Sequence, residues 1–261
     1  MTVIVCFKIT YDTSQLRPAA ESGAPRLENA PLRISTFDEN ALELAVQLKE
    51  QFGARIVGLS LLPAAPPRDL VLRALAIGAD EVFLIHDQTA HQADALATTT
   101  ILAAALRKLG PWQLLICGDG SIDQYNRQVG PRLAEALGVP SLTQVIKVEY
   151  AANQVRVERA LEDRIEIVEA PLPALITVSP EINQPRIPTV LQIMGASKKP
   201  VTNWSLADLG LAEAPTAGLR TLDVSAPPSE RKRISVAGEN AAQIGRSLAR
   251  ILLEAGVVKT T

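Results

Sequence analysis

The chain has 261 residues, of which 47% are hydrophobic and 21% charged, a composition typical of a protein that buries a sizeable core. Its net charge of −2 at pH 7 argues against a nucleic-acid-binding surface, which requires a basic surplus. Two cysteines in a chain of this length argue against a secreted disulfide scaffold. The longest mostly apolar stretch, Ala95–Leu106, is too short to span a bilayer, and no signal peptide is recognisable, so we expect a cytoplasmic protein without membrane insertion.

Up to Gly138 the chain alternates between predicted strands and predicted helices. The strands are continuous apolar runs; Asp38 and Asp94 are expected to cap two of the helices, and a glycine ends each of the four. In chain order the elements are strand Val3–Lys8, helix Ala41–Gln51, strand Arg55–Leu62, helix Arg68–Ile77, strand Glu81–Ile85, helix Asp94–Leu109, strand Trp112–Cys117 and helix Gln128–Leu137. This alternation predicts a doubly wound α/β fold around a mostly parallel sheet.

After Val139 the pattern changes to strands in near succession, which predicts an antiparallel extension of the sheet. These strands are expected at Thr143–Tyr150, Gln154–Leu161, Arg164–Glu169 and Ala174–Val178. Residues 180–203 show no periodicity beyond a short helical possibility at Val190–Ala196, and residues 212–232 have the composition of a linker. A strand at Ile234–Val236 and an amphipathic helix at Glu239–Ala255 follow, so we divide the chain into an α/β domain, 1–211, and a linker with a C-terminal arm, 212–261.

The segment Gly118–Gly130 is the most informative loop in the chain, because it follows a buried strand and opens a helix. Ligands usually bind at the carboxyl end of a parallel strand, and the free amides of a helix start favour an anion. Arg127 and Gln128 lie in the first turn, where they could contact a phosphate. The loop is neither a dinucleotide fingerprint nor a Walker P-loop, so a nucleotide site and a plain polar connection are about equally supported here.

Other candidate chemistry is not supported by the sequence. The two histidines, His86 and His91, have no cysteine or carboxylate at metal-ligand spacing, so we expect no metal site. Cys6 and Cys117 lie inside apolar strands and are interpreted as small core residues. No nucleophile-elbow motif is present, and we therefore predict no catalytic residue and no enzymatic activity.

Several motifs, in this order, resemble the electron-transfer flavoprotein β-subunit over nearly the whole chain. They are Val5–Lys8, Ser35–Ala41, Ala74–Asp80, Asp94–Thr98, Gly118–Pro131, Val157–Glu162, Pro171–Ala174, Ile182–Pro188, Ile193–Ala196 and Lys198–Pro200. Each motif alone is weak, whereas their collinear order is specific. The Cys117–Ser121 start of the loop, and Lys199-Pro200 followed by Trp204-Ser205, resemble most closely the branch linked to carnitine reduction.

The resemblance implies a heterodimer with an α-subunit that holds the redox FAD, and a fold like that of the adenine nucleotide α-hydrolases. The β-subunit's own sheet would bind AMP, or a second FAD in electron-bifurcating members, and the sequence leaves that choice open. The residues expected around this nucleotide are Cys6, Ser35, Thr36, Phe37, Asp38, Leu61, Gly118, Asp119, Gly120, Ser121, Ile122, Asp123, Asn126, Arg127, Gln128 and Val129. The phosphate would lie at residues 126–129.

The resemblance also assigns two regions to partner proteins. Residues 185–194, which we call the docking segment, would insert into a flavin dehydrogenase, with Val190 or Leu191 as the anchor. Its expected contact residues are Pro185, Arg186, Ile187, Val190, Leu191, Ile193 and Met194. The C-terminal arm would pack on the α-subunit.

Two alternatives of other classes remain. A stand-alone nucleotide sensor of the universal-stress-protein or ATP-pyrophosphatase kind would share the sheet architecture. Residues 8–12, however, lack the pyrophosphatase loop, and a lone sensor has no use for the arm. An NAD-dependent enzyme is disfavoured because the chain contains no glycine fingerprint and no acid–base constellation.

Overall fold

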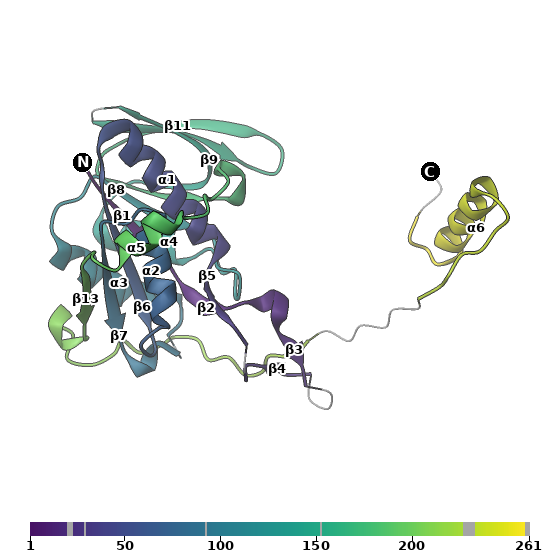
Figure 1. Ribbon diagram of the computed structural model, residues 1–261, viewed down its shortest axis with the longest axis horizontal. Coiled ribbons are helices and arrows are strands. Elements are labelled where there is room, and N and C mark those ends of the chain that lie inside the picture. Colours follow the sequence, from purple (N-terminus) through teal and green to yellow (C-terminus); the bar gives the residue numbers. More distant parts are fainter. Residues whose placement is uncertain (20–22, 29, 92, 152, 227–232, 259–261) are drawn as a thin grey trace.

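The computed structural model describes residues 1–19, 23–28, 30–91, 93–151, 153–226 and 233–258, and a nine-stranded sheet forms its centre (Figure 1). The strands of this sheet are β1 (Thr2–Cys6), β6 (Arg55–Leu62), β7 (Glu81–His86), β8 (Leu114–Gly118), β9 (Ser141–Ala151), β10 (Gln154–Ala160), β11 (Ile165–Pro171), β12 (Ala174–Val178) and β13 (Val201–Trp204). Their order is β11-β10-β9-β12-β8-β1-β6-β7-β13. In this spatial order, all neighbouring strands from β9 through β12, β8, β1, β6 and β7 to β13 are parallel. The strand β10 pairs antiparallel with β9 and β11, so the predicted fold class is confirmed.

Helices cover both faces of the sheet. The helices α1 (Thr36–Phe52), α2 (Arg68–Ile77) and α5 (Val190–Ala196) lie on one face, and α3 (Ala95–Leu109) and α4 (Val129–Leu137) on the other. Side chains of β1 alternate between the two layers: Val3 and Val5 join the core under α1 and α2, whereas Ile4 and Cys6 join the core under α3. Because both faces are buried, the strands are apolar throughout, and each buried aliphatic side chain contributes about 1.5–3 kcal/mol.

Smaller elements flank this body. They are the strands β2 (Ile9–Tyr11), β3 (Arg17–Pro18), β4 (Pro25–Arg26) and β5 (Leu32–Ile34) and the 3-10 helices Thr13–Gln15, Gln88–His91, Pro180–Ile182 and Ala207–Leu209. The pair β2–β5 is antiparallel and carries the chain from the end of β1 to the start of α1.

Three sequence predictions were wrong. Ser35 rather than Asp38 occupies the N-cap of α1, and Asp38 is buried inside the first turn because two strand-end amides bind its carboxylate. The helical possibility at Val190–Ala196 is confirmed as α5, but the strand β13, which begins at Val201 and pairs with β7, was missed because its pattern is too short to be recognised without that neighbour. Residues 234–236, Ile-Ser-Val, form no strand among the described residues, since a tripeptide without a pairing partner does not hold an extended ladder.

The strand order contains a reversal at β1. From β1 the chain moves outward to β6 and β7, and then returns to β8 on the opposite side of β1. At such a switch point the connections leave in opposite directions, so a crevice opens beyond the carboxyl ends of the two strands. The fold therefore places a crevice beside Cys6 and Gly118, where the sequence predicts the loop with candidate chemistry.

The C-terminal helix α6 (Ala241–Glu254) stands apart from the sheet in Figure 1. Within the described part of the chain no α6 side chain is buried, although Ile244, Leu248 and Leu253 are apolar. The preceding linker is attached to the domain at Asp94, whose carboxylate caps α3 through Ala97 N (2.8 Å) and also accepts from Gly218 N (2.8 Å) and Leu219 N (3.1 Å). Asp94 therefore caps a helix, as predicted, and also fixes the start of the arm.

We expect Asp94→Ala to lower the free energy of unfolding by about 1–2 kcal/mol, because a helix cap and two linker hydrogen bonds are lost. These hydrogen bonds lower the pKa of Asp94, so its contribution is present above about pH 4 and is lost as the carboxylate protonates at lower pH. Urea unfolding at about pH 7 and about pH 3 measures the difference. Asp94→Ser, which keeps a capping oxygen, is the control; an equal loss at both pH values would contradict the prediction.

Candidate functional site

A cavity of about 450 Å³ occupies the switch-point crevice. Its walls are the end of β1 with residues 7–11, the loop after β6, the start of α3 and the loop between β8 and α4. This volume lies within the range of small-molecule sites, about 300–1,000 Å³. A more open hollow between α3 and α4, which includes Leu96 and Arg107, lies outside the crevice.

Most of the sequence-predicted nucleotide residues line this cavity. They are Cys6, Asp38, Leu61, Gly118, Asp119, Gly120, Ser121, Asp123, Asn126, Arg127, Gln128 and Val129. The cavity lining does not include Ser35, Thr36, Phe37 or Ile122. Ser35 is instead completely buried, and its hydroxyl oxygen has no hydrogen-bond partner among the described residues.

The sequence prediction missed part of the lining. Lys8 follows β1, Pro63–Pro66 follow β6, and Asp94 and Thr98 begin α3, yet all of them face the same cavity as the loop. The carboxyl ends of parallel strands meet at one edge of a sheet. The positions of Lys8 and Pro63–Pro66 directly after predicted strands could therefore have indicated that they face the same cavity.

The loop after β8 is folded around an aromatic contact. Tyr125 and Arg127 adopt left-handed backbone conformations, with φ of 49° and 56°. The Tyr125 ring lies 5.2 Å from the Phe37 ring and covers Gly120, where a Cβ atom would lie 2.2 Å from the Tyr125 ring. Glycine at position 120 is therefore required for the ring to close down on the loop.

Both cations of the cavity are paired with carboxylates. Arg127 Nε lies 2.9 Å from Asp119 Oδ2, and the Arg127 guanidinium lies 4.6 Å from the centre of the Tyr125 ring. The Asp119 contact is an ion pair without hydrogen-bond geometry, while the other Asp119 oxygen accepts from Thr177 Oγ1 at 2.9 Å. Lys8 Nζ pairs with Asp123 at 2.5 Å. An anion entering the cavity must therefore compete with Asp119 and Asp123 for these cations.

The start of α4 borders the same cavity. Gln128 is the N-cap residue, and its Oε1 accepts from Arg132 Nε at 3.2 Å, which directs its side-chain amide nitrogen away from Arg132. Gly130 packs against β12 so closely that a Cβ atom would lie 2.4 Å from Thr177 Cγ2. Glycine at this position brings the first-turn amides and the positive end of the helix dipole to the cavity edge, an arrangement that favours an anion.

A family model described as the electron transfer flavoprotein domain matches residues 27–209. This match covers more than half of the chain, including α1, the loop between β8 and α4, and the docking segment. The chain belongs to the electron transfer flavoprotein family. Membership identifies it as a protein of electron transport associated with flavin.

The floor of the cavity in this electron transfer flavoprotein chain contains two thiols and one carboxyl group. Cys6 and Cys117 are buried on neighbouring strands, and their mutual hydrogen bond and burial raise the pKa of Cys117. The Cys117 thiol is therefore protonated at neutral pH and a poor nucleophile. Asp38 Oδ2 accepts from Lys8 N (2.8 Å) and Asp38 Oδ1 from Gly118 N (3.1 Å), so α1 is joined to the ends of both strands.

Among the described residues, no three His, Cys, Asp or Glu side chains gather to hold a metal ion. No helix in the described ranges is long and apolar enough to cross a membrane.

The docking segment of the electron transfer flavoprotein chain is exposed. Ile187 is 87% exposed and Leu191 80%, and Val190, Ile193 and Met194 are also exposed. Arg186, which the sequence analysis grouped with them, instead turns its guanidinium toward Glu43 and Glu50 of α1. These ion pairs hold Arg186 on its own domain, and its assignment as a docking contact stays a prediction.

We predict that Asp38 titrates near neutral pH. Burial raises the pKa of Asp38 to about 7, while hydrogen bonds from Lys8 N and Gly118 N oppose this shift. Because the folded protein holds this proton more tightly than the unfolded chain, the resulting stabilisation is fully present below about pH 4 and is lost as pH rises through about 7. Carboxyl ¹³C NMR, with Asp38→Asn to identify the resonance, measures the pKa. A midpoint near the ordinary value of 3.8 would contradict the prediction.

Proposed function

We propose that this chain is the β-subunit of a heterodimeric electron-transfer flavoprotein that helps carry electrons between a flavin dehydrogenase and a downstream acceptor. Within it, FAD held mainly by the α-subunit supplies the electron-carrying chemistry. The observation that carries the proposal is the switch-point cavity inside the family domain, bordered by a helix start and by the loop after β8. We further propose that the chain acts as a binding subunit without catalysis of its own. We assign the protein to the cytoplasm and to the family branch linked to carnitine reduction.

The cavity residues fit an adenine nucleotide, which we propose to be AMP, or a second FAD if the protein bifurcates electrons. Gln128 and Val129, at the start of α4, would hold the phosphate. Cys6 and Leu61, which also line the cavity, offer an apolar surface for the base. Arg127 would approach the phosphate by exchanging Asp119 for it, since an arginine binds either anion. Exposed apolar side chains on α6 and on the docking segment favour a partnered subunit over a stand-alone nucleotide sensor.

The heterodimer tests this function directly. We expect the denatured complex to release FAD and either AMP or additional FAD, separable by chromatography. Release of one FAD and no second nucleotide would contradict the nucleotide site of this chain. A colourless monomer that releases only an adenine nucleotide would favour the sensor.

We expect Gln128→Glu to reduce the amount of nucleotide released per complex at least about tenfold, because a carboxylate at the helix start repels the phosphate and competes for the amides. Gln154→Glu, at the exposed start of β10, changes the net charge equally and is the matched control. Unchanged nucleotide content in Gln128→Glu, measured after denaturation, would show that the phosphate does not lie at α4.

We expect deletion of residues 220–261 to leave a folded domain that no longer binds the α-subunit. The reason is that α6 buries none of its described residues on the domain, so its apolar side chains contribute little to the domain's own stability. Leu248→Glu should weaken the heterodimer in the same direction, and Ala249→Glu, about 100° further around the helix, is its control. Analytical ultracentrifugation measures the assembly; normal affinity after deletion would contradict the role of the arm.

A further inference from the structure

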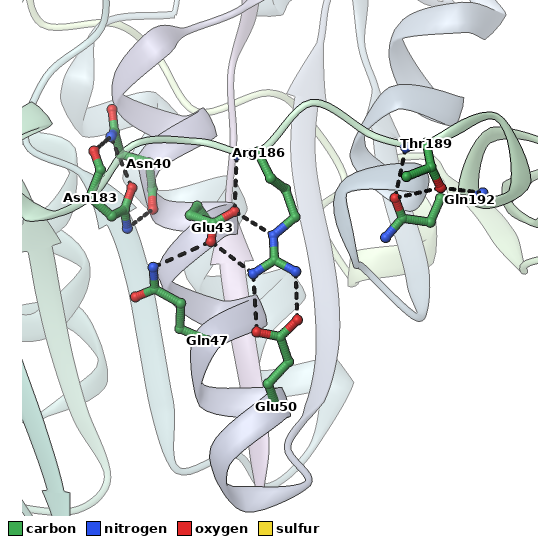
Figure 2. A network of polar contacts seen from close by, with 8 residues as sticks. All are labelled: Asn40, Glu43, Gln47, Glu50, Asn183, Arg186, Thr189 and Gln192. Atoms are coloured by element: carbon green, nitrogen blue, oxygen red, sulfur yellow. Dashed lines mark hydrogen bonds and ion pairs between the residues drawn. The ribbon is translucent and has the colours of Figure 1, made fainter.

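The exposed docking segment is connected to the domain by attachments on both sides. On its amino-terminal side, Asn40 of α1 and Asn183 form a pair of side-chain amides (Figure 2). Asn40 Nδ2 donates to the backbone oxygen of Asn183 (2.8 Å) and to its side-chain oxygen (3.0 Å), and Asn183 Nδ2 donates back to Asn40 O (3.1 Å). These hydrogen bonds hold the backbone at Asn183 against α1, just before the docking segment begins.

Arg186 makes the strongest of these attachments. Its guanidinium donates to both oxygens of Glu43 (2.8 and 2.9 Å) and both oxygens of Glu50 (2.5 and 3.1 Å), and its backbone N also donates to Glu43 (3.1 Å). Glu43 is only 4% exposed, whereas Glu50 is 58% exposed. Figure 2 shows the guanidinium lying between the two carboxylates on the outer side of α1. A planar guanidinium donates to all four oxygens of the two carboxylates, whereas the three donors of a lysine ammonium sit on one nitrogen and cannot reach all four.

The segment needs this support because α5 is short. It has seven residues, of which only Ala196 is buried within the described helix. Thr189 and Gln192 form a capping box that starts the helix, with Thr189 N donating to Gln192 Oε1 at 2.8 Å. A capped helix of about two turns is not stable in water by itself, so tertiary attachments determine whether α5 forms.

The carboxyl-terminal side of the segment is attached by Lys199. Its Nζ donates to Leu75 O and Ala79 O, both at 2.7 Å, and so binds carbonyls at the end of α2. Burial lowers the pKa of Lys199, and the amine remains bound between these carbonyls. The apolar residues 187–194 thus lie between one attachment to α1 and another to α2.

We propose that Arg186 is a positioning residue: held by Glu43 and Glu50, it keeps the docking segment in the conformation that enters the apolar pocket of the dehydrogenase. The inference rests on the proposed function of this segment. A segment ordered before binding loses less conformational entropy when it docks, so its affinity is higher with the same contact residues. Arg186 acts through the shape of the segment, and Val190 and Leu191 make the contact.

The test uses the complete heterodimer and two readouts, amide hydrogen exchange of Val190–Ala196 and electron transfer from the cognate dehydrogenase. We expect Arg186→Gln to raise the exchange rate of this segment at least tenfold and the KM for the dehydrogenase about tenfold, with kcat and flavin content unchanged. Arg186→Lys should give an intermediate rise in both, because it keeps the charge but binds fewer carboxylate oxygens.

Three further variants separate positioning from contact. Arg156→Gln removes a surface arginine whose ion pair with Glu169 joins β10 to β11, at the opposite edge of the sheet from β13, and both readouts should stay at the wild-type values. The double variant Val190→Ala/Leu191→Ala should raise KM while residues 183–186 keep wild-type exchange. Glu50→Gln removes the exposed half of the Arg186 attachment and should give a smaller rise in both readouts, which tests the proposal even if Arg186→Gln fails to assemble.

The outcomes distinguish the inference from the function on which it rests. Wild-type exchange in Arg186→Gln, or in Glu50→Gln if that alone assembles, would overturn the positioning role. Raised exchange with unchanged KM would also overturn it, provided that the double variant raises KM. If the double variant leaves KM unchanged, the proposed docking function fails, and raised exchange in Arg186→Gln then supports only the structural attachment of the segment.

Discussion

The carboxylate of Asp38 is the contact on which the rest of the site depends. It lies in the first turn of α1 and accepts one hydrogen bond from the residue after β1 and one from the last residue of β8. These strands flank the reversal in strand order, so a single side chain of α1 joins the ends of the two strands beside the crevice. A buried carboxylate is costly unless its oxygens are satisfied, and the backbone amides of Lys8 and Gly118 provide that satisfaction. Gly118 must be glycine because a Cβ atom there would lie 2.6 Å from Asp38.

The helix α1 connects the two functional regions of the molecule. Its first turn carries Asp38 at the cavity, and its outer side carries Asn40, Glu43 and Glu50, which hold the segment before α5 (Figure 2). Because these side chains project from one hydrogen-bonded helix, the cavity and the docking segment keep a fixed separation. A protein that passes electrons between partners benefits from such rigidity, since the distance between bound groups is then set by the fold.

The sequence predicted the features that depend on local patterns. Apolar runs and glycine stops predicted the alternation of strands and helices, and the bounds of α2, Arg68–Ile77, agree with the structure. It predicted the cavity correctly in outline because a polar loop after a buried strand has a known place at the sheet edge. It could not predict features that depend on distant partners. From the sequence alone, Asp38 looks like the N-cap of a helix, because its hydrogen-bond donors belong to distant strand ends. The two glutamates that bind Arg186 likewise lie more than a hundred residues away in the chain.

The charges of the cavity limit what its side chains can contribute to the binding of an anion. Lys8 is paired with Asp123 and Arg127 with Asp119, and Asp38 and Asp94 add two further carboxyl groups to the lining, so neither cation is free to attract an anion. An anion that displaces a carboxylate from one of these cations gains little binding free energy, because the lost ion pair offsets the new one. On the proposed function, most of the attraction for a phosphate then comes from the first-turn amides of α4, which are backbone groups. Backbone donors persist when side chains change, provided that Gly130 lets the helix start approach β12 and Gly120 lets Tyr125 close the loop. The two glycines therefore constrain the anion site more strongly than the identity of the side chains between them.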